Sequence, residues 1–371
     1  MKKSHIFLLS SAALLSMSSA WAGPIMIYGR IDTGIAYNNY GGDTHKDNTI
    51  SMNSGLNTAS RIGIRGSEEI TSDFSVGFRL ENRFDSTTGE LKGGSSGNKL
   101  FEGCSYLSMT SKKFGELSAG RISGIVSGSG AYDLEFFMDS FGGGTYGTGL
   151  APVKSSRIDN MFTYRSPMLS GVQATLQYSM KTESSEEGNE ATSEVDRFYA
   201  GGLRYNLGKL NLIAAYEETD WGSKQKAKAT TSKKIVTLGG SYRWEPVTVY
   251  LQAQYFNGVN KLDGFSSAGN IKGYGLYGGT QFWFGLSSWQ SMVYYRDYKV
   301  DTDNGIKNHS ASMIGFATKY LYRPSKSVDI YIGGGISRWT ARINQRRNLP
   351  KTMLLTLLPA LPSTFNCALA A

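Results

Sequence analysis

The 371-residue sequence is poor in the residues that build most catalytic sites, with only 3 His and 2 Cys. His5 lies in a leader-like N-terminal segment, and His45 and His309 lie in separate loop-like stretches. None of them has an obvious partner for general acid–base or triad chemistry. No metal-ligand spacing and no phosphate-binding glycine loop is present. We therefore expect no enzyme activity, no metal and no other cofactor.

Long hydrophobic runs are also lacking. After the N-terminal segment, no stretch approaches the ~20 consecutive apolar residues of a membrane-spanning helix. The segment itself has a charged start (Met1-Lys2-Lys3), an apolar stretch over 6–15 and a small-residue site ending at Ala22. This pattern predicts a secretory signal peptide over 1–22, with an uncleaved anchor as the alternative. Cys104 and Cys367 lie in very different contexts, and no structural disulfide is expected.

A strong excess of one charge is absent once the ends of the chain are set aside. The formal net charge is +9, but Lys2 and Lys3 belong to the predicted signal, and residues 340–371 carry four bases and no acid. In the remainder, 33 bases face 30 acids. No nucleic-acid partner is expected from this balance.

Alternation of apolar and polar residues extends from Ile25 to about Trp339. In its first stretch, Ile27, Ile31 and Ile35 fall on one face of an extended chain, and Arg30 and Asp32 fall on the other. Charged side chains would be costly in a packed core, so the apolar face points to lipid and the charged face to water. The sequence therefore predicts a transmembrane antiparallel β-barrel with a polar lumen. Five aromatic residues near strand ends suit its interfacial girdles: Tyr37, Trp244, Trp283, Trp289 and Trp339.

Connector lengths support the same fold. Fifteen strands are expected, at 25–37, 58–66, 73–84, 103–111, 115–122, 157–165, 171–180, 197–206, 209–218, 234–244, 247–256, 271–284, 288–299, 311–322 and 327–339. Short turns alternate with long connectors at 38–57, 85–102, 123–156, 181–196, 219–233, 257–270 and 300–310. Transmembrane barrels alternate long extracellular loops with short periplasmic turns in this way.

Four segments of the sequence resemble Gram-negative general porins, and the resemblance is strongest to the porins of beta-proteobacteria. They are Ile27-Tyr28-Gly29-Arg30-Ile31-Asp32-Thr33-Gly34, the stretch from Ser60 to Glu69, the stretch from Phe114 to Arg121, and the strand from Arg157 to Arg165. The resemblance implies an all-β barrel of 16 strands that assembles as a homotrimer in the outer membrane. Its partners would be membrane lipid, lipopolysaccharide, and the small solutes and ions that diffuse through. It also implies a third loop, 123–156 here, that folds into the lumen and narrows the channel.

The resemblance assigns the pore-lining charges as well. Bases on the wall would be Arg30, Arg61 and Arg157, to which strand parity adds Arg65, Arg79 and Arg121; loop acids would be Asp133, Glu135 and Asp139. The alternative is that the arginines only pair locally with wall acids such as Asp32 and Glu81. Gly103 stands where the family commonly has arginine. That departure predicts a wider or less anion-attracting constriction than in relatives that keep the arginine.

The C-terminal end departs from the expected pattern. Fifteen strands conflict with the even number of bacterial barrels, and Pro350, Pro359 and Pro362 oppose a central closing strand. We therefore expect a barrel over 23–339, a lost closing strand, and an anomalous tail over 340–371. The tail arises from a frameshift or assembly error near residue 340, or it is a genuine divergent end. Resequencing distinguishes the two origins. A second function also stays open at this stage, a non-conducting barrel used as an adhesin or structural anchor.

Overall fold

The structure is a computed structural model that describes residues 25–39, 49–93, 99–128, 130–134, 152–182, 190, 192–223, 231–262, 265–303, 306–343 and 363–370. The predicted signal peptide lies outside these residues. Eighteen strands are present: β1 (Met26–Arg30), β2 (Asp32–Asn39), β3 (Thr49–Ser54), β4 (Arg61–Glu69), β5 (Phe74–Arg83), β6 (Cys104–Ser111), β7 (Gly115–Ser123), β8 (Arg157–Arg165), β9 (Val172–Ser179), β10 (Arg197–Leu207), β11 (Leu210–Asp220), β12 (Lys233–Trp244), β13 (Val247–Leu262), β14 (Phe265–Phe284), β15 (Ser287–Asp303), β16 (Ile306–Ser325), β17 (Val328–Ile343) and β18 (Ser363–Ala370). Within the described residues, no helix is long and apolar enough to cross a membrane.

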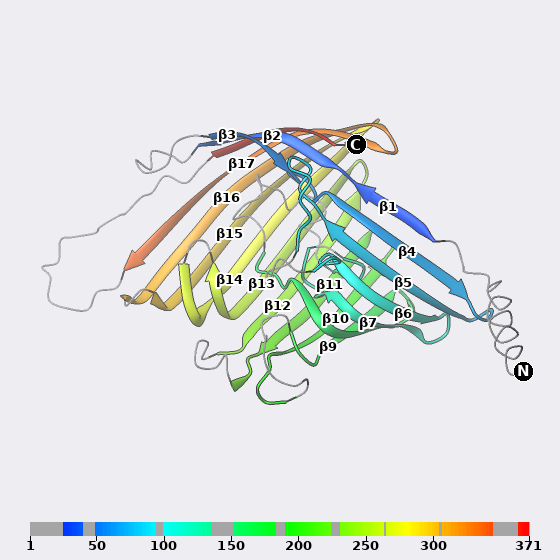
Figure 1. Ribbon diagram of the computed structural model, residues 1–371. Coiled ribbons are helices and arrows are strands. Elements are labelled where there is room, and N and C mark those ends of the chain that lie inside the picture. The colour runs from blue at the N-terminus through cyan, green and yellow to red at the C-terminus, as the bar shows by residue number, and fades with distance from the viewer. Residues whose placement is uncertain are drawn as a thin grey trace, which may run out of the picture.

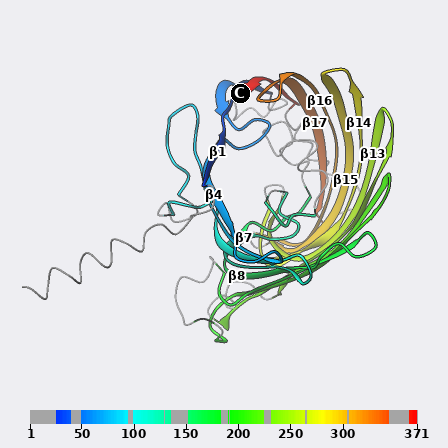
Figure 2. The ribbon, with the colours of Figure 1, turned by 90° about the vertical axis from the view of Figure 1, so that its right-hand side faces the viewer.

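The strands form one antiparallel sheet that closes into a ring (Figures 1 and 2). Only Ile31 separates β1 from β2, and residues 55–60 separate β3 from β4. β1 pairs with β4, and β2 pairs with β3. β1 and β2 are therefore two parts of one interrupted strand, and β3 and β4 are two parts of the next. Counted this way, the barrel has the sixteen strands expected from the sequence.

The outer face is apolar and the inner face is polar, the reverse of a soluble barrel. Along β13, Val249 and Leu251 are exposed, whereas Thr248, Gln252 and Gln254 are buried. The same alternation recurs around the ring, and many of the largest hydrophobic side chains lie on the surface. Leaving these side chains in water would be unfavourable, so the outer face is a surface for hydrocarbon.

The closing strand, which was predicted to be lost, is present as β18, so that prediction is wrong. β18 lies between β17 and β2, with Ile332 in register with Cys367 and Cys367 with Ile35. The prolines that argued against a strand all precede Ser363. The final segment itself alternates, because Phe365, Cys367 and Leu369 are separated by Asn366 and Ala368. β17 also continues past Trp339 to Ile343.

Three of the predicted long loops are wrong in extent. The connector expected over 38–57 contains β3 (Thr49–Ser54), a short strand whose alternation covers only six residues. Residues 257–270 and 300–310 were expected to be connectors, but β13 and β14, and likewise β15 and β16, continue as hairpins to within two residues of each other. Continued pairing satisfies backbone hydrogen bonds outside the membrane without needing apolar alternation. The register shifts between Phe256 and Lys261 mark where this extension leaves the regular barrel.

Candidate functional site: the arginine wall and the infolded loop

The inward positions of β1, β4, β5 and β6 form three rows across the sheet. The register aligns Arg30 with Arg61 and Arg83, then Tyr28 with Gly63, Glu81 and Cys104, and then Met26 with Arg65, Arg79 and Tyr106. Neighbouring inward positions on paired strands bring their side chains close together. The sequence thereby concentrates basic residues on one patch of the lumen. This patch is called the arginine wall below, and it contains Arg30, Arg61, Arg65, Arg79 and Arg83.

Glu81 is the centre of this patch and is almost completely shielded from solvent. Arg61 pairs with it at 3.4 Å and Arg79 at 2.8 Å. Tyr28 donates to Glu81 at 2.9 Å and accepts from Arg79 Nε at 2.7 Å. Gly63 makes this possible, because a Cβ there would lie 2.5 Å from the Tyr28 hydroxyl oxygen. A buried carboxylate thus fixes two guanidinium groups in place.

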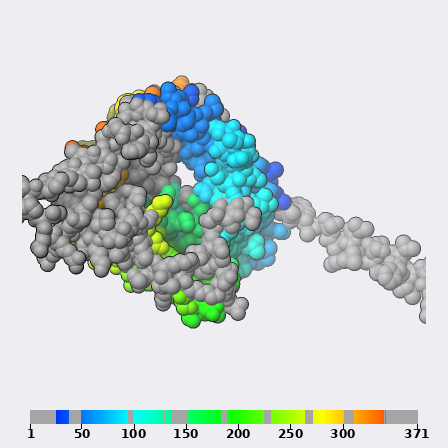
Figure 3. Space-filling model, turned by 60° about the vertical axis from the view of Figure 1, so that its left-hand side comes forward, coloured from blue at the N-terminus to red at the C-terminus, as the bar shows by residue number. Residues whose placement is uncertain are grey.

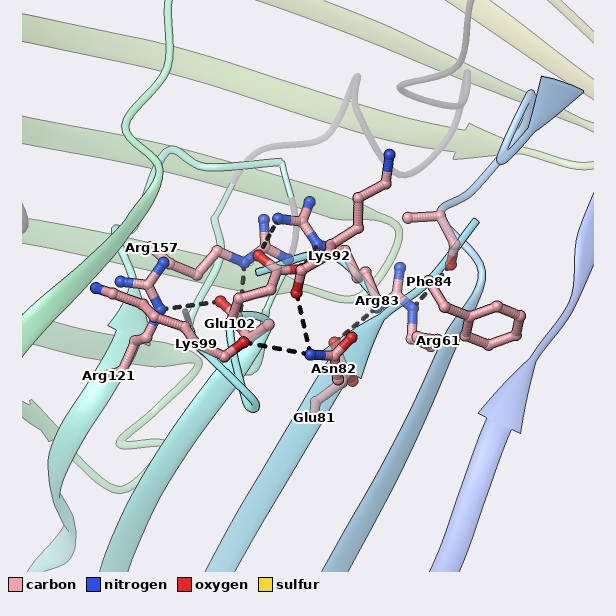
Figure 4. Close-up of polar contacts among 12 residues, drawn as sticks. Arg61, Glu81, Asn82, Arg83, Phe84, Lys92, Lys99, Glu102, Arg121 and Arg157 are labelled. Atoms are coloured by element: carbon pink, nitrogen blue, oxygen red, sulfur yellow. Dashed lines mark hydrogen bonds and ion pairs between the residues drawn. The ribbon is translucent and has the colours of Figure 1, made fainter. Parts of the chain in front are cut away.

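A second carboxylate, Glu102, holds Arg83. The guanidinium forms a two-point contact, with Nε to Oε1 and Nη2 to Oε2 both at 2.5 Å. Arg157 reaches the same region from β8 and donates through Nε to the main-chain oxygen of Gly103 at 3.1 Å. Figure 4 shows Arg61, Arg83 and Arg157 gathered around Glu81 and Glu102. Among the described residues, no carboxylate lies within ion-pairing distance of Arg157.

A flanking group sits beside this patch. Arg121 pairs with Asp159 at 2.5 Å and donates to the main-chain oxygen of Glu102 at 2.9 Å. Lys99 contacts the other oxygen of Asp159. Arg121 borders the register shift between Gly120 and Ile122, where regular strand parity breaks down. Its place is therefore at the edge of the arginine wall.

The segment after β7 runs inside the ring (Figure 2). The two described parts of this segment, one at each end, both form hydrogen bonds with Glu217 on β11. Its Oε1 accepts from the Val126 amide and from the Ser155 hydroxyl, each at 2.9 Å. Gln254 on β13 accepts from the Val153 amide and donates to its carbonyl, both at 2.8 Å. These contacts confirm that the third loop enters the lumen.

Apolar packing reinforces the loop. A buried cluster joins loop residues to the inner wall of β7, β8, β10 and β11: Ile122, Ile125, Val126, Tyr132, Leu134, Ile158, Met161, Phe198, Ala200, Ile213 and Ala215. Burial raises the pKa of the Tyr132 hydroxyl, which stays protonated and donates to Glu116 at 2.7 Å. Arg165 covers the Tyr132 ring and pairs with Glu116. The loop base is thus a packed part of the barrel.

The remaining lumen is open beside the arginines. Figure 3 shows an opening next to the blue-to-cyan wall, on the side of β1 to β6. The arginine-bearing strands therefore border the open part of the lumen, where diffusing solutes pass their charges.

Comparisons with known proteins agree with this geometry. A family model described as Gram-negative porin matches residues 9–338. The chain belongs to the Gram-negative porin family. It is 26% identical to an outer membrane porin protein of Bordetella pertussis, over 89% of this chain and 94% of that relative.

Two solved structures share the fold of this porin. The anion-selective porin from Comamonas acidovorans superposes with a TM-score of 0.64 at 19% identity, covering 94% of this chain and 98% of that one. The trimer form of OmpT from Vibrio cholerae superposes with a TM-score of 0.59 at 14% identity, covering 94% and 99%. The chain is thus an outer-membrane porin, a passive diffusion channel and not an enzyme.

The structure places five of the predicted wall arginines on this patch. Arg61, Arg79 and Arg157 lie around the two carboxylates, and Arg121 flanks them. Arg65 is the register partner of Arg79 and lies 5.5 Å from the Tyr28 ring centre, and Arg30 is exposed opposite Arg61. Local pairing, the alternative interpretation, does hold Arg61 and Arg79 through Glu81. Asp32 has a different role, because it accepts hydrogen bonds from the Tyr331 hydroxyl and from the backbone of residues 57 and 58.

The loop acids are only partly described. The main-chain oxygen of Asp133 accepts from Arg204 at 3.0 Å. Glu135 and Asp139 lie outside the described residues. Sequence reasoning missed Arg83, Glu102 and Glu217. Alternation could have found Arg83, which shares the parity of Arg79 and Glu81 on the same strand.

Proposed function

We propose that this porin passes small hydrophilic anions in preference to cations, and that Arg61, Arg79, Arg83 and Arg157 form its selectivity filter. One observation carries the proposal. These four guanidinium groups share only two carboxylates, Glu81 and Glu102, among the described residues. The excess positive charge faces a water-filled passage with low-dielectric walls, which raises the local concentration of anions.

The loop supplies the opposite side of the proposed filter. We infer that Asp133, Glu135 and Asp139 face the arginines across the lumen and supply the negative side of a transverse field. The support is that both described parts of the loop are anchored to the inner wall, at Glu217 and at Gln254. In the same way, Gly103 leaves the constriction with one arginine fewer than relatives that keep arginine there.

The ion preference is measurable with the full-length channel in a planar bilayer. Under a roughly tenfold KCl gradient, we expect a reversal potential whose sign reports chloride as the more permeant ion. A reversal potential of zero, or one of the opposite sign, would contradict the proposal. Liposome swelling with small neutral solutes serves as the control that the channel is open.

We also infer that the porin assembles as a homotrimer through the outer face of β1 to β4. The large apolar side chains exposed there are mainly isoleucine, including Ile27, Ile50 and Ile62, with Tyr37 as the only large aromatic among the described residues. Exposed aromatic residues, which favour the lipid interface, are far more frequent along the outer face of β12 to β16. A solved relative, OmpT of Vibrio cholerae, is described in a trimer form.

Light scattering of the detergent-solubilised protein tests this assembly. The wild-type particle should contain three chains, and Ile62→Arg should reduce it to one chain by burying an unpaired charge in the interface. Ile314→Arg is the matched control, because Ile314 is similarly exposed on the far wall. A wild-type monomer, or equal effects of the two substitutions, would refute the proposed interface.

A further inference from the structure

A large aromatic side chain faces the lumen near the short turns, away from the arginine wall. Trp283 on β14 was expected in an outer girdle. Its register partner is Ser288, which is fully buried, whereas Phe282 and Phe284 on either side of it lie on the outer face. Trp283 therefore points inward, yet it remains 42% exposed. An aromatic ring open to channel water offers a face on which the apolar side of a solute can stack.

The ring forms one side of a cavity of about 310 Å³ on the inner wall of β11 to β14. The rest of its lining is mostly polar and uncharged, from Asn211, Ser241, Thr248, Tyr250 and Gln281. The Tyr250 hydroxyl donates to Gln281 at 3.1 Å, which fixes both side chains. Tyr250 is the register partner of Gly279 on β14, so no side chain at that position of β14 fills the space beside the ring.

The chemistry of this lining selects a class of ligand. A pyranose ring carries C–H groups on its faces and hydroxyl groups around its edge. The negative face of an indole ring attracts the C–H groups. Amides and hydroxyls that both donate and accept match the sugar hydroxyls. We propose that this pocket is a binding site for the pyranose ring of a neutral sugar, which it captures on the periplasmic side of the constriction.

An organic anion fits the same pocket less well. Arg243 is its single cation, and that side chain is 62% exposed and already pairs with Glu245 at 3.3 Å. The neutral polar groups outnumber it five to one. The sugar site is independent of the proposed anion filter, since its residues come from other strands and its occupancy does not require ion selectivity.

Calorimetric titration of the full-length porin in detergent tests the assignment. Glucose and maltose should bind saturably, with dissociation constants on the order of 1 to 10 mM, weak enough for a solute to leave a channel. Sorbitol, which has the hydroxyls of glucose but no ring, should bind at least about tenfold more weakly because it cannot stack on the indole. Added from the periplasmic side of a bilayer, maltose should lower the conductance with the same concentration dependence.

Two tryptophan substitutions make the test specific. Trp283→Ala should weaken sugar binding by about tenfold or more, and Trp283→Tyr should retain most of it because a stacking face remains. Trp289→Ala is the matched control, because Trp289 lies on the outer face of the adjacent strand and should leave binding unchanged. The proposal is overturned if the wild-type protein shows no saturable sugar binding, if sorbitol binds equally well, or if Trp283→Ala has no effect. Saturable binding of benzoate that Arg243→Gln abolishes, without sugar binding, would reassign the pocket to organic anions.

Discussion

Reversing the charge of Arg157 is expected to shift the channel from anion preference toward cation preference. Arg157 is anchored only by the main-chain oxygen of Gly103, so its charge is not cancelled by a described neighbour. Arg157→Glu replaces a positive charge with a negative one beside Arg61 and Arg83. We expect the anion-to-cation permeability ratio to fall about fivefold, or ~1 kcal/mol at the partly screened distances of a hydrated pore.

A matched substitution separates this local effect from a change in overall charge. Arg323 lies near the end of β16 and pairs with Asp329 on β17 at 2.6 Å. Arg323→Glu makes the same change in charge far from the arginine wall and should leave the reversal potential nearly unchanged. Equal shifts for the two variants would show that selectivity comes from net charge and not from the filter.

Removing the carboxylate of Glu217 should release the infolded loop. Glu217→Leu leaves the Val126 amide and the Ser155 hydroxyl, both buried, without their acceptor. The loss should cost about 3 kcal/mol, the penalty for two buried donors left unpaired. A loop that no longer stays against the wall should give larger and noisier single-channel conductance, together with a lower thermal midpoint.

Two further variants make the interpretation specific. Glu217→Gln keeps a side-chain oxygen that can accept from Val126 and should restore most of the wild-type conductance. Glu218→Leu changes the next residue, which contacts Tyr216 and Lys234 instead of the loop. It should leave the conductance and its noise unchanged. If Glu217→Leu shows wild-type current, Glu217 does not hold the loop in place.

Period-two alternation was enough to predict most of the barrel. It predicted each strand from β4 to β17, because a wall between water and hydrocarbon repeats one constraint along each strand. It failed where that constraint is absent or obscured. The hairpins of β13 to β16 extend past the alternating stretches, β3 spans only six residues inside an expected connector, and β18 was hidden by the prolines that precede it.

The site was less predictable than the fold. Parity could place arginines in the lumen, and it identified Arg61 and Arg79 together with their candidate partner Glu81. It could not show that Glu102 would pair with Arg83. Nor could it show that Arg121, next to a register shift in β7, would pair with Asp159. The contact between Val126 and Glu217 spans 91 residues and depends on the route of a loop, which no local pattern encodes. The origin of residues 340–371 stays a prediction for resequencing.

The central claim is that one face of each strand meets hydrocarbon and the other meets water, and cysteine accessibility tests it most directly. In a Cys104→Ser and Cys367→Ser background, a charged, membrane-impermeant thiol reagent is applied to the porin in liposomes. Arg65→Cys and Tyr250→Cys should react and lower the conductance, while Ile62→Cys and Leu251→Cys should remain unmodified. Modification at 62 and 251 with protection at 65 and 250 would contradict the account.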